Sequence, residues 1–328
     1  MEMSGKILVT GANGFLAVNV INALLAACCQ VRGILRRKGS YQGAVSESLE
    51  LYEGDFTDET VLPDAMSGCS AVVHCAACTD QSASEEEYRR VNVDAVKNLL
   101  EAAAVAGIGR VVNISSANIF GYGTKESPGD ESSPVRFPFT ESGYAMSKAG
   151  AQKVVDSFRD RLEVITLCPT FMLGPYGSPA GSCRIVSMGY RRRLVFCPPG
   201  GKNFVAVQDV AAAAVAALTE GIPGEAYLLT GENLSYREFY RLLSERTGCR
   251  SVRISLPAAL LLSLGRAGDL LAALGMKTEL STVNMRLLCT GNYYSSSKAA
   301  EDLGFRCRRI SDAVDETVAW LLHTGKLK

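Results

Sequence analysis

Two stretches of this chain place a tyrosine four residues before a lysine, and the first is Tyr144-Ala-Met-Ser-Lys148. Positions i and i+4 of a helix share one face, so the phenol and the ammonium group would lie together. A nearby cation stabilises a phenolate and lowers the pKa of the phenol from its ordinary value of about 10. The pair could then protonate a carbonyl oxygen or deprotonate an alcohol. The second copy, Tyr294-Ser-Ser-Ser-Lys298, has the same spacing, so spacing alone does not choose between them.

A glycine-rich turn near the start of the chain is a candidate dinucleotide site. The segment Thr10-Gly-Ala-Asn-Gly-Phe-Leu-Ala17 follows an expected strand over residues 6–10 and opens an expected helix over residues 14–28. The first glycine permits a tight turn, the second lets the backbone approach a pyrophosphate, and the helix N-terminus offers N–H groups to that anion. The residues expected to bind a cofactor here are Gly11, Asn13, Gly14, Phe15 and Leu16.

The end of the second expected strand, residues 30–35, carries cations. A carboxylate at this point would accept a hydrogen bond from a ribose 2′-hydroxyl and repel a 2′-phosphate, but the chain reads Leu35-Arg36-Arg37-Lys38. Guanidinium groups bind phosphate through paired hydrogen bonds. The sequence therefore predicts NADP(H) as the preferred cofactor, with NAD(H) as the alternative, and Arg36 followed by Arg37 as the phosphate ligands. A solvated basic turn is the competing interpretation.

Strand and helix patterns alternate through the first half of the chain. Strands are expected at 6–10, 30–35, 49–53, 71–74, 110–114 and 164–167, with helices over 14–28, 85–106 and 145–158. This alternation predicts an α/β fold in which a doubly wound parallel sheet of the Rossmann type is covered on both faces. We assign residues 1–173 and 202–230 to this dinucleotide-binding domain. Residues 174–201 and 231–328 would form a smaller, discontinuous, mixed α/β substrate lobe.

Two further segments each allow both a structural and a functional interpretation. Residues 121–143 are polar and contain Pro128, Pro134 and Pro138, and a loop of this length is expected to be an active-site flap or a tolerated insertion. Residues 257–274 form a leucine-rich helical pattern. That helix should either pack in the core or line an apolar substrate pocket.

Composition excludes several classes of protein. Lys and Arg number 34, as do Asp and Glu, so nothing favours a nucleic-acid partner. The 11 cysteines are scattered, which favours reduced thiols and a cytoplasmic location. No signal peptide is expected, and Arg266 and Asp269 interrupt the longest apolar stretch, so no transmembrane segment is expected either. Cys75-Ala-Ala-Cys78 has no second pair to complete a zinc site, so no metal is expected.

Together these motifs resemble the extended, epimerase/dehydratase-like branch of the short-chain dehydrogenase/reductase superfamily, and the resemblance runs nearly the whole chain. Its character is closest to the dihydroflavonol reductase and 3β-hydroxysteroid dehydrogenase members. Besides the glycine turn and the Tyr144–Lys148 pair, the resemblance is carried by Gly54-Asp55-Phe56, His74-Cys-Ala-Ala77, the helix at Asn92, Ser115-Ser-Ala-Asn-Ile-Phe-Gly121 and Cys168-Pro-Thr-Phe-Met-Leu-Gly-Pro175.

The resemblance implies a role for each matching residue. Tyr144 would be the acid or base, Lys148 its tuner and a ribose ligand, and Ser116 a hydrogen-bond partner of the substrate oxygen. Asn92 would support the site through backbone or water contacts. Further cofactor contacts would come from Asp55, Phe56, Ala76, Pro169 and Thr170. The second tyrosine–lysine copy would be structural, with Ser296 or Ser297 capping a helix.

Three functional classes remain open at this point. The first is an NADP(H)-dependent reductase of a small, rather apolar ketone or aldehyde, or a dehydrogenase of the corresponding alcohol. The second is a sugar-nucleotide epimerase that retains NAD(P), and the third is a cofactor-binding regulator without catalysis. The substrate and the choice between monomer and homodimer are not determined by these motifs.

Overall fold

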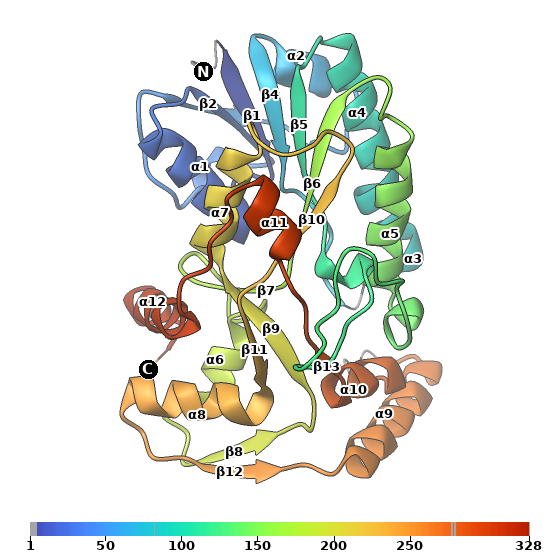
Figure 1. Cartoon of the computed structure of the whole chain (residues 1–328), viewed down its shortest axis with the longest axis vertical. Helices are drawn as coiled ribbons and strands as arrows, with labels where there is room; N and C mark the ends of the chain where they lie inside the picture. Colours follow the sequence, from blue (N-terminus) through green and yellow to red (C-terminus); the bar gives the residue numbers. More distant parts are fainter. Residues whose placement is uncertain (1–4, 82, 277, 279, 328) are drawn as a thin grey trace.

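The computed structural model of the chain describes residues 5–81, 83–276, 278 and 280–327. Among these residues, a seven-stranded sheet has the order β10-β6-β5-β4-β1-β2-β3, and every neighbouring pair in it is parallel (Figure 1). This doubly wound order confirms the predicted fold class. The strands are β1 (Lys6–Thr10), β2 (Val31–Leu35), β3 (Leu49–Glu53), β4 (Cys69–His74), β5 (Arg110–Ile114), β6 (Glu163–Pro169) and β10 (Ala226–Leu229).

Helices cover both faces of this sheet because successive residues of a buried strand point to opposite sides. Ile7 and Val9 of β1 join one apolar cluster with α1 (Phe15–Ala26) and α7 (Val207–Ala216), whereas Leu8 joins another with α2 (Leu62–Met66), α4 (Ala95–Val105) and α5 (Gly143–Asp156). Near-continuous apolar runs in the strands therefore reflect burial on two faces. The expected helix over residues 85–106 is α3 (Glu85–Tyr88) and α4, joined by a π-helical segment at Arg89–Asp94.

A second lobe lies below the sheet in Figure 1. Its central strand β9 (Gly201–Ala206) pairs with β11 (Glu232–Ser235), β13 (Gly291–Asn292) and β7 (Phe171–Leu173). Its core contains Phe204, Phe239 and Tyr240, and it includes α6 (Arg184–Gly189), α8 (Tyr236–Thr247) and α12 (Ile310–His323). The expected boundary at residue 202 assigned most of β9 to the dinucleotide-binding domain, whereas β9 pairs in this smaller sheet. The division into two domains stays a prediction.

The leucine-rich segment forms a helix but not a core helix. It is α9 (Ala258–Ala273), which packs against α10 (Thr282–Cys289), and α11 (Ser297–Asp302) follows. Leu260, Leu264, Leu270 and Leu274 are exposed, so the expectation of core packing is wrong for most of this helix. None of the helices in the described residues combines the length and the apolar character that a membrane crossing requires.

Candidate active site

The turn after β1 is fastened to the end of β4 by the side chain of Thr10. Its Oγ1 accepts hydrogen bonds from the N–H groups of Cys75 and Ala76, over 3.1 and 3.2 Å, and lies 2.8 Å from Nδ1 of His74. Both hydroxyl lone pairs are thereby used, so the hydroxyl donates its proton to Nδ1. His74 is consequently a neutral ring with Nδ1 unprotonated, and burial lowers its pKa to about 3.

The geometry of the glycine turn fits a bound pyrophosphate. Gly11 has a φ of 66°, and a Cβ on it would lie 3.0 Å from Cα of Ala76, so this position requires glycine. No side chain caps α1 at Gly14, which leaves the first-turn N–H groups available to an anion. Asn13 and Gly14 are exposed and Phe15 is partly buried, whereas the Leu16 side chain is buried in the core. Leu16 could therefore contact a nucleotide only through its main chain.

The cationic segment after β2 lies against this turn. Nδ2 of Asn13 donates to Oγ of Ser40 over 3.1 Å, and Ser40 belongs to a short 3-10 helix at Lys38–Ser40. Arg36 and Arg37 are exposed, and neither guanidinium group pairs with a carboxylate in the described part of the chain. The sequence did not indicate Ser40, because its hydrogen bond with Asn13 joins two segments that are distant in the chain.

The third strand ends beside the same site. Oδ1 of Asp55 accepts from the N–H and hydroxyl groups of Thr57, over 3.0 and 2.9 Å. The ring centroid of Phe56 lies 5.5 Å from that of His74. Because parallel strands end at one edge of the sheet, Asp55, Phe56 and Ala76 reach the edge that carries the glycine turn.

The three expected catalytic side chains meet where β5 ends and α5 begins. Lys148 is 5% exposed, and its Nζ donates to the main-chain oxygen of Ile114 over 3.1 Å. Burial lowers the pKa of Lys148 to about 8. Ser116 is 8% exposed, and its hydroxyl oxygen accepts from the N–H of Asn118 over 3.3 Å. Tyr144 lies in the first turn of α5, near enough to Ser116 for the serine hydroxyl to affect the pKa of its phenol.

The electrostatics of Tyr144 differ from the expectation that Lys148 lowers its pKa. Burial raises the pKa of the phenol, and the neighbouring Ser116 hydroxyl opposes this rise. In this structure Ser116 is therefore the group that favours the phenolate.

Asn92 supports this site from the π-helical segment. Its Oδ1 accepts from the N–H of Cys78 over 2.8 Å, and its Nδ2 donates to the oxygen of Cys78 over 3.0 Å. The same Nδ2 donates to Oγ of Ser147 over 2.9 Å, and Ser147 donates to the oxygen of Tyr144 over 2.8 Å. Asn92 thus holds the segment after β4 against the catalytic helix, partly through side-chain contacts that the sequence did not indicate.

The end of β6 completes the site and leads into the second lobe. Pro169 is buried, and the Thr170 hydroxyl donates to Oδ1 of Asn203 over 2.6 Å. Cys168 is fully buried, and burial raises the pKa of its thiol to about 12. Lys202, on β9, also lies here with its Nζ 5.1 Å from the centroid of the Phe171 ring. Burial lowers the pKa of Lys202 to about 8, and no carboxylate pairs with it among the described residues.

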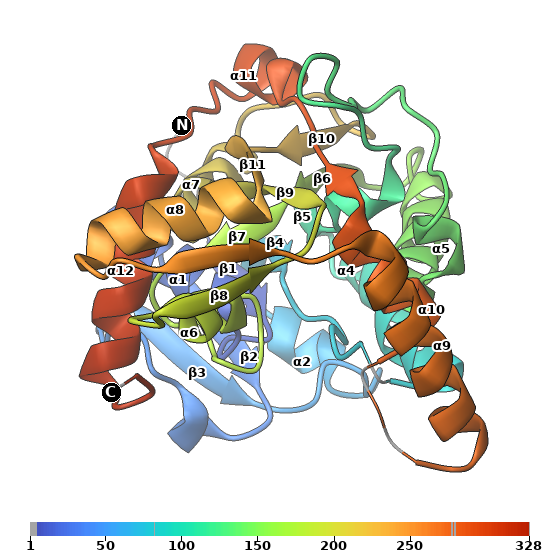
Figure 2. The same cartoon turned by 90° about the horizontal axis from the view of Figure 1, so that it is seen from below.

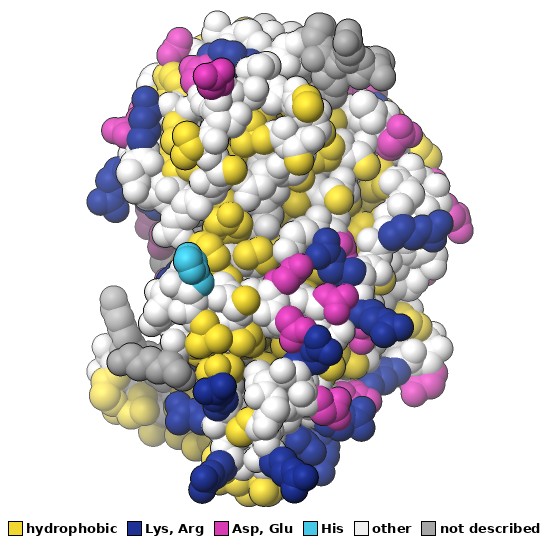
Figure 3. Space-filling view, turned by 90° about the vertical axis from the view of Figure 1, so that its left-hand side faces the viewer, with side chains coloured by type: hydrophobic (Ala, Val, Ile, Leu, Met, Phe, Trp, Pro, Cys, Tyr) yellow, Lys and Arg dark blue, Asp and Glu magenta, His cyan; other side chains and the backbone are white. Residues whose placement is uncertain are grey.

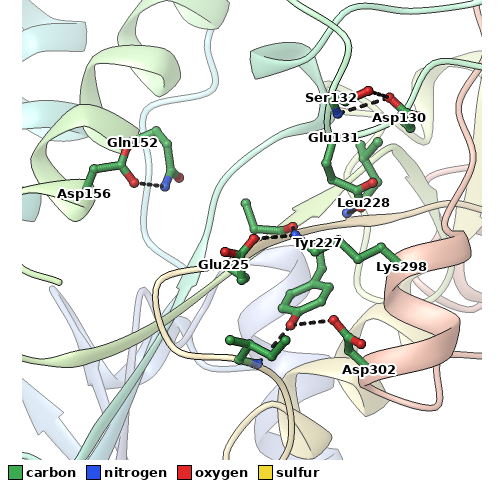
Figure 4. Close-up of polar contacts among 12 residues, drawn as sticks. Asp130, Glu131, Ser132, Gln152, Asp156, Glu225, Tyr227, Leu228, Lys298 and Asp302 are labelled. Atoms are coloured by element: carbon green, nitrogen blue, oxygen red, sulfur yellow. Dashed lines mark hydrogen bonds and ion pairs between the residues drawn. The ribbon is translucent and has the colours of Figure 1, made fainter.

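The second tyrosine–lysine copy does not form a pair. Tyr294 makes an isolated β-bridge with Gly129, whereas Lys298 lies in α11. Nζ of Lys298 donates to Glu225 over 2.6 Å and lies 4.8 Å from the centroid of the Tyr227 ring (Figure 4). Ser296 stands at the N-cap position of α11, but its hydroxyl accepts from Thr230 and caps nothing, so the expected capping bond is absent from these described residues.

The loop over residues 121–143 is fastened at several points. Gly123 and Gly129 form bridges with Tyr293 and Tyr294, and Lys125 pairs with Glu238 of α8. Glu131 accepts from the N–H of Leu228 on the edge strand β10 over 2.7 Å (Figure 4). These contacts tie the loop to the second lobe and to the edge strand β10 of the main sheet. Its expected function as a flap stays a prediction.

The cysteine pair after β4 has a simpler explanation than metal or redox chemistry. Cys75 and Cys78 are both free thiols, and burial raises the pKa of Cys75 to about 12. In the described part of the chain, no cluster of His, Cys, Asp and Glu could hold a metal ion. These cysteines instead belong to the strand end that Thr10 and Asn92 hold in place.

Comparison of the sequence with models of protein families shows to which family the chain belongs. Residues 7–229 match the model of the NAD dependent epimerase/dehydratase family. The chain belongs to this family. The matched region runs from β1 to the end of β10, so it includes the seven-stranded sheet and every candidate cofactor and catalytic residue.

Individual members of the family resemble the chain over its whole length. Sterol demethylase protein B of Methylococcus capsulatus is 29% identical over 98% of this chain and 99% of its own. A putative dihydroflavonol 4-reductase of Synechocystis is 28% identical over 100% of this chain and 98% of its own. The solved structure of gox2253 has a TM-score of 0.83 and 27% identity, covering 99% of this chain and 100% of its own.

These matches place the chain in the extended short-chain dehydrogenase/reductase group, with dihydroflavonol reductase-like and 3β-hydroxysteroid dehydrogenase-like relatives. The protein is therefore an NAD(P)-dependent oxidoreductase of that type. UDP-glucose 4-epimerase of Thermotoga maritima shares the fold with a TM-score of 0.76, but at 20% identity.

Proposed function

We propose that this protein reduces a ketone or aldehyde of a small, rather apolar molecule with NADPH, or oxidises the corresponding alcohol. The observation that carries the proposal is the meeting of buried Ser116, at the end of β5, with Tyr144 and the buried ammonium group of Lys148 on successive turns of α5. The arrangement joins a proton donor, a polarising hydroxyl and a cation at the edge where the glycine turn lies.

Each side chain would have a distinct role. A bound nicotinamide supplies or takes up the hydride. Tyr144 would give its phenolic proton to the carbonyl oxygen, or accept the proton of the alcohol in the reverse direction. Ser116 would donate a hydrogen bond to the same oxygen, which stabilises the negative charge that develops there. Lys148, whose ammonium group is held by the main-chain oxygen of Ile114, would hold the nicotinamide ribose hydroxyls.

The preference for NADPH rests on the segment after β2. Arg36 and Arg37 are exposed beside the glycine turn, without carboxylate partners in the described residues, so both are available to a 2′-phosphate. The family is named for NAD, and solved neighbours such as the UDP-glucose 4-epimerase of Thermus thermophilus were obtained with NAD. The phosphate preference is therefore a property that we propose for this chain.

The names of several relatives support an apolar substrate. They include sterol demethylase protein B, a farnesyl-dihydroquinoline oxide ketoreductase of Stigmatella aurantiaca and a 3 beta-hydroxysteroid dehydrogenase of Mycobacterium tuberculosis. All three names describe mostly hydrocarbon molecules. We infer that the substrate of this chain belongs to the same chemical class.

Lys202 favours a second candidate function. Lys202 is only partly exposed, and a partly buried cation without an acidic partner is stabilised when a ligand supplies the negative charge. An anionic substrate, such as a sugar nucleotide, would provide that charge, and the reaction would then be epimerisation with retained cofactor. The position of Lys202 on β9, beside Phe171 and close to Thr170, is the observation that supports this alternative.

The two candidates predict different states of the purified protein. A reductase should be isolated largely free of nucleotide and should oxidise added NADPH when a sterol ketone or another apolar carbonyl compound is present. An epimerase should carry bound nucleotide in about one-to-one amount and turn over without consuming NADPH. Absorbance of the nucleotide released by denaturation, followed by an NADPH oxidation assay on both substrate classes, decides between them.

A further inference from the structure

Helix α9 buries its glycines and Leu261 and exposes most of its other leucines. A Cβ on Gly265 would lie 2.8 Å from Cα of Thr282, and one on Gly268 would overlap the oxygen of Leu280, so these glycines form the face that packs against α10. On the outer side, the exposed fractions are 48% for Leu260, 43% for Leu264, 38% for Leu271 and 70% for Leu274. Their spacing puts these four leucines on one side of the helix.

The neighbouring strand pair exposes a second group of apolar side chains. Strands β8 (Leu194–Cys197) and β12 (Val252–Ser255) run parallel, with Leu194 opposite Val252 and Phe196 opposite Ile254. All four are exposed, whereas Val195 and Cys197 on the other face of β8 are buried in the lobe core. Helix α9 begins three residues after β12. Figure 1 shows β8, β12 and α9 at the lower end of the molecule, and all three are visible in the view from below in Figure 2. We call these four residues and the four leucines of α9 the apolar face.

Basic residues outnumber acidic ones in the two segments that carry the apolar face. Residues 190–197 and 250–276 contain one acidic residue, Asp269, and these basic ones: Arg191, Arg192, Arg193, Arg250, Arg253 and Arg266. Asp269 accepts from the N–H of Thr282 over 3.1 Å at the start of α10. Figure 3 views this end of the molecule from the side, where Lys and Arg side chains lie with hydrophobic ones and with some Asp and Glu side chains. An exposed apolar area with cations in the same segments suits a partner that has an apolar interior and an anionic surface.

We propose that the apolar face binds the surface of a bilayer containing anionic lipids, with the leucines of α9 entering the boundary between headgroups and acyl chains. The charges argue against a second copy as the occupant. A two-fold contact would set this face against itself and bring the arginines of one chain toward those of the other. Lipid phosphates supply the opposite charge instead.

The apolar face is joined to the candidate active site through α10. The Arg286 side chain lies 4.8 Å from the centroid of the Phe137 ring and 3.3 Å from Oε2 of Glu141. Both partners belong to the loop that leads into α5, with Phe137 seven and Glu141 three residues before Tyr144 in the chain. Bilayer binding through α9 would therefore hold the catalytic helix near the lipid in which an apolar substrate dissolves.

Flotation with lipid vesicles tests the proposal on the full chain with NADPH bound. The protein should float with vesicles of phosphatidylcholine and phosphatidylglycerol, and much less with phosphatidylcholine alone or at high salt. A Leu264→Asp, Leu271→Asp variant should lower the bound fraction about tenfold or more, because it places charges among leucines that enter the bilayer. An Arg192→Glu, Arg193→Glu variant should lower binding to the anionic vesicles alone by a similar factor.

Leu322→Asp is the matched control, because Leu322 on α12 has the same 43% exposure as Leu264 but lies outside the apolar face. It should float like the wild type. Flotation of Leu264→Asp, Leu271→Asp at the wild-type level, or no flotation of the wild type, overturns the proposal. A wild-type dimer that does not float and that the leucine variant converts to monomers would show that the face binds a second copy. None of these readouts depends on turnover, so they remain informative if the proposed reductase activity fails.

Discussion

The hydroxyl group of Thr10 donates a hydrogen bond to Nδ1 of His74 over 2.8 Å, while its oxygen accepts from two main-chain N–H groups of the next segment. Three bonds to one hydroxyl join the glycine turn to the end of β4. The arrangement requires an unprotonated Nδ1, and His74 is 1% exposed, so protonation of the ring would break the bond inside the core.

His74 should therefore make the fold sensitive to acid. Its pKa is about 3 in the folded protein against 6.5 as the ordinary value, so below pH 6.5 the unfolded chain binds a proton that the folded chain does not. The free energy of unfolding should fall as the pH drops from 6.5, by about 2 kcal/mol at pH ~4.5.

Urea unfolding of the wild type and of His74→Asn across this range isolates the effect. The asparagine oxygen still accepts from Thr10 but does not titrate. Carboxylates elsewhere contribute equally to both proteins. The free energy of unfolding of the wild type should therefore fall more than that of the variant as the pH drops. Parallel curves would contradict the assignment of His74 as a neutral, buried acceptor.

Tyr144→Phe should abolish turnover and leave nucleotide binding unchanged, because the phenol is the proposed proton donor. The expected loss in kcat is about 100-fold to 10,000-fold. Tyr294→Phe is the matched control, since the Tyr294 hydroxyl is buried without a hydrogen-bond partner among the described residues. That variant should keep its activity within about twofold and unfold no earlier than the wild type. Equal losses in the two variants would reject Tyr144 as the acid.

Arg36→Ala should weaken NADPH binding and leave NADH binding nearly unchanged. The guanidinium group is proposed to bind the 2′-phosphate, which NADH lacks, so the expected loss is about 10-fold to 100-fold for NADPH alone. Fluorescence titration with each nucleotide measures both constants. A wild type that binds the two nucleotides equally would disprove the preference before any variant is made.

Asn92→Ala should destabilise the fold more than Ser147→Ala. The first change removes both bonds to the main chain of Cys78, whereas the second removes only the contacts of the serine hydroxyl. We expect a loss of about 2 kcal/mol for Asn92→Ala and less than about 1 kcal/mol for Ser147→Ala in urea unfolding. The Asn92 variant should also lower kcat, since it releases the segment that holds α5. Equal stability of the two variants would contradict this role.

Local patterns predicted the main sheet closely. The strands at residues 6–10, 49–53 and 110–114 have the expected bounds. At 6–10 and 110–114 the reason is that a run of buried apolar residues reflects burial within the segment itself. The π-helical segment that carries Asn92 was not predictable in the same way. Its purpose lies in contacts with Cys78 and Ser147, which are distant in sequence.

The sequence by itself determined the fold class, the glycine turn and the tyrosine–lysine spacing, because each depends on residues close together in the chain. Only the tertiary structure decided which copy of that spacing meets Ser116. Tyr144 and Lys148 lie on one helix beside β5, whereas Tyr294 and Lys298 belong to different elements. It also decided that the leucines of α9 face outward, since burial depends on which segments meet in space, and at α9 the glycines meet α10.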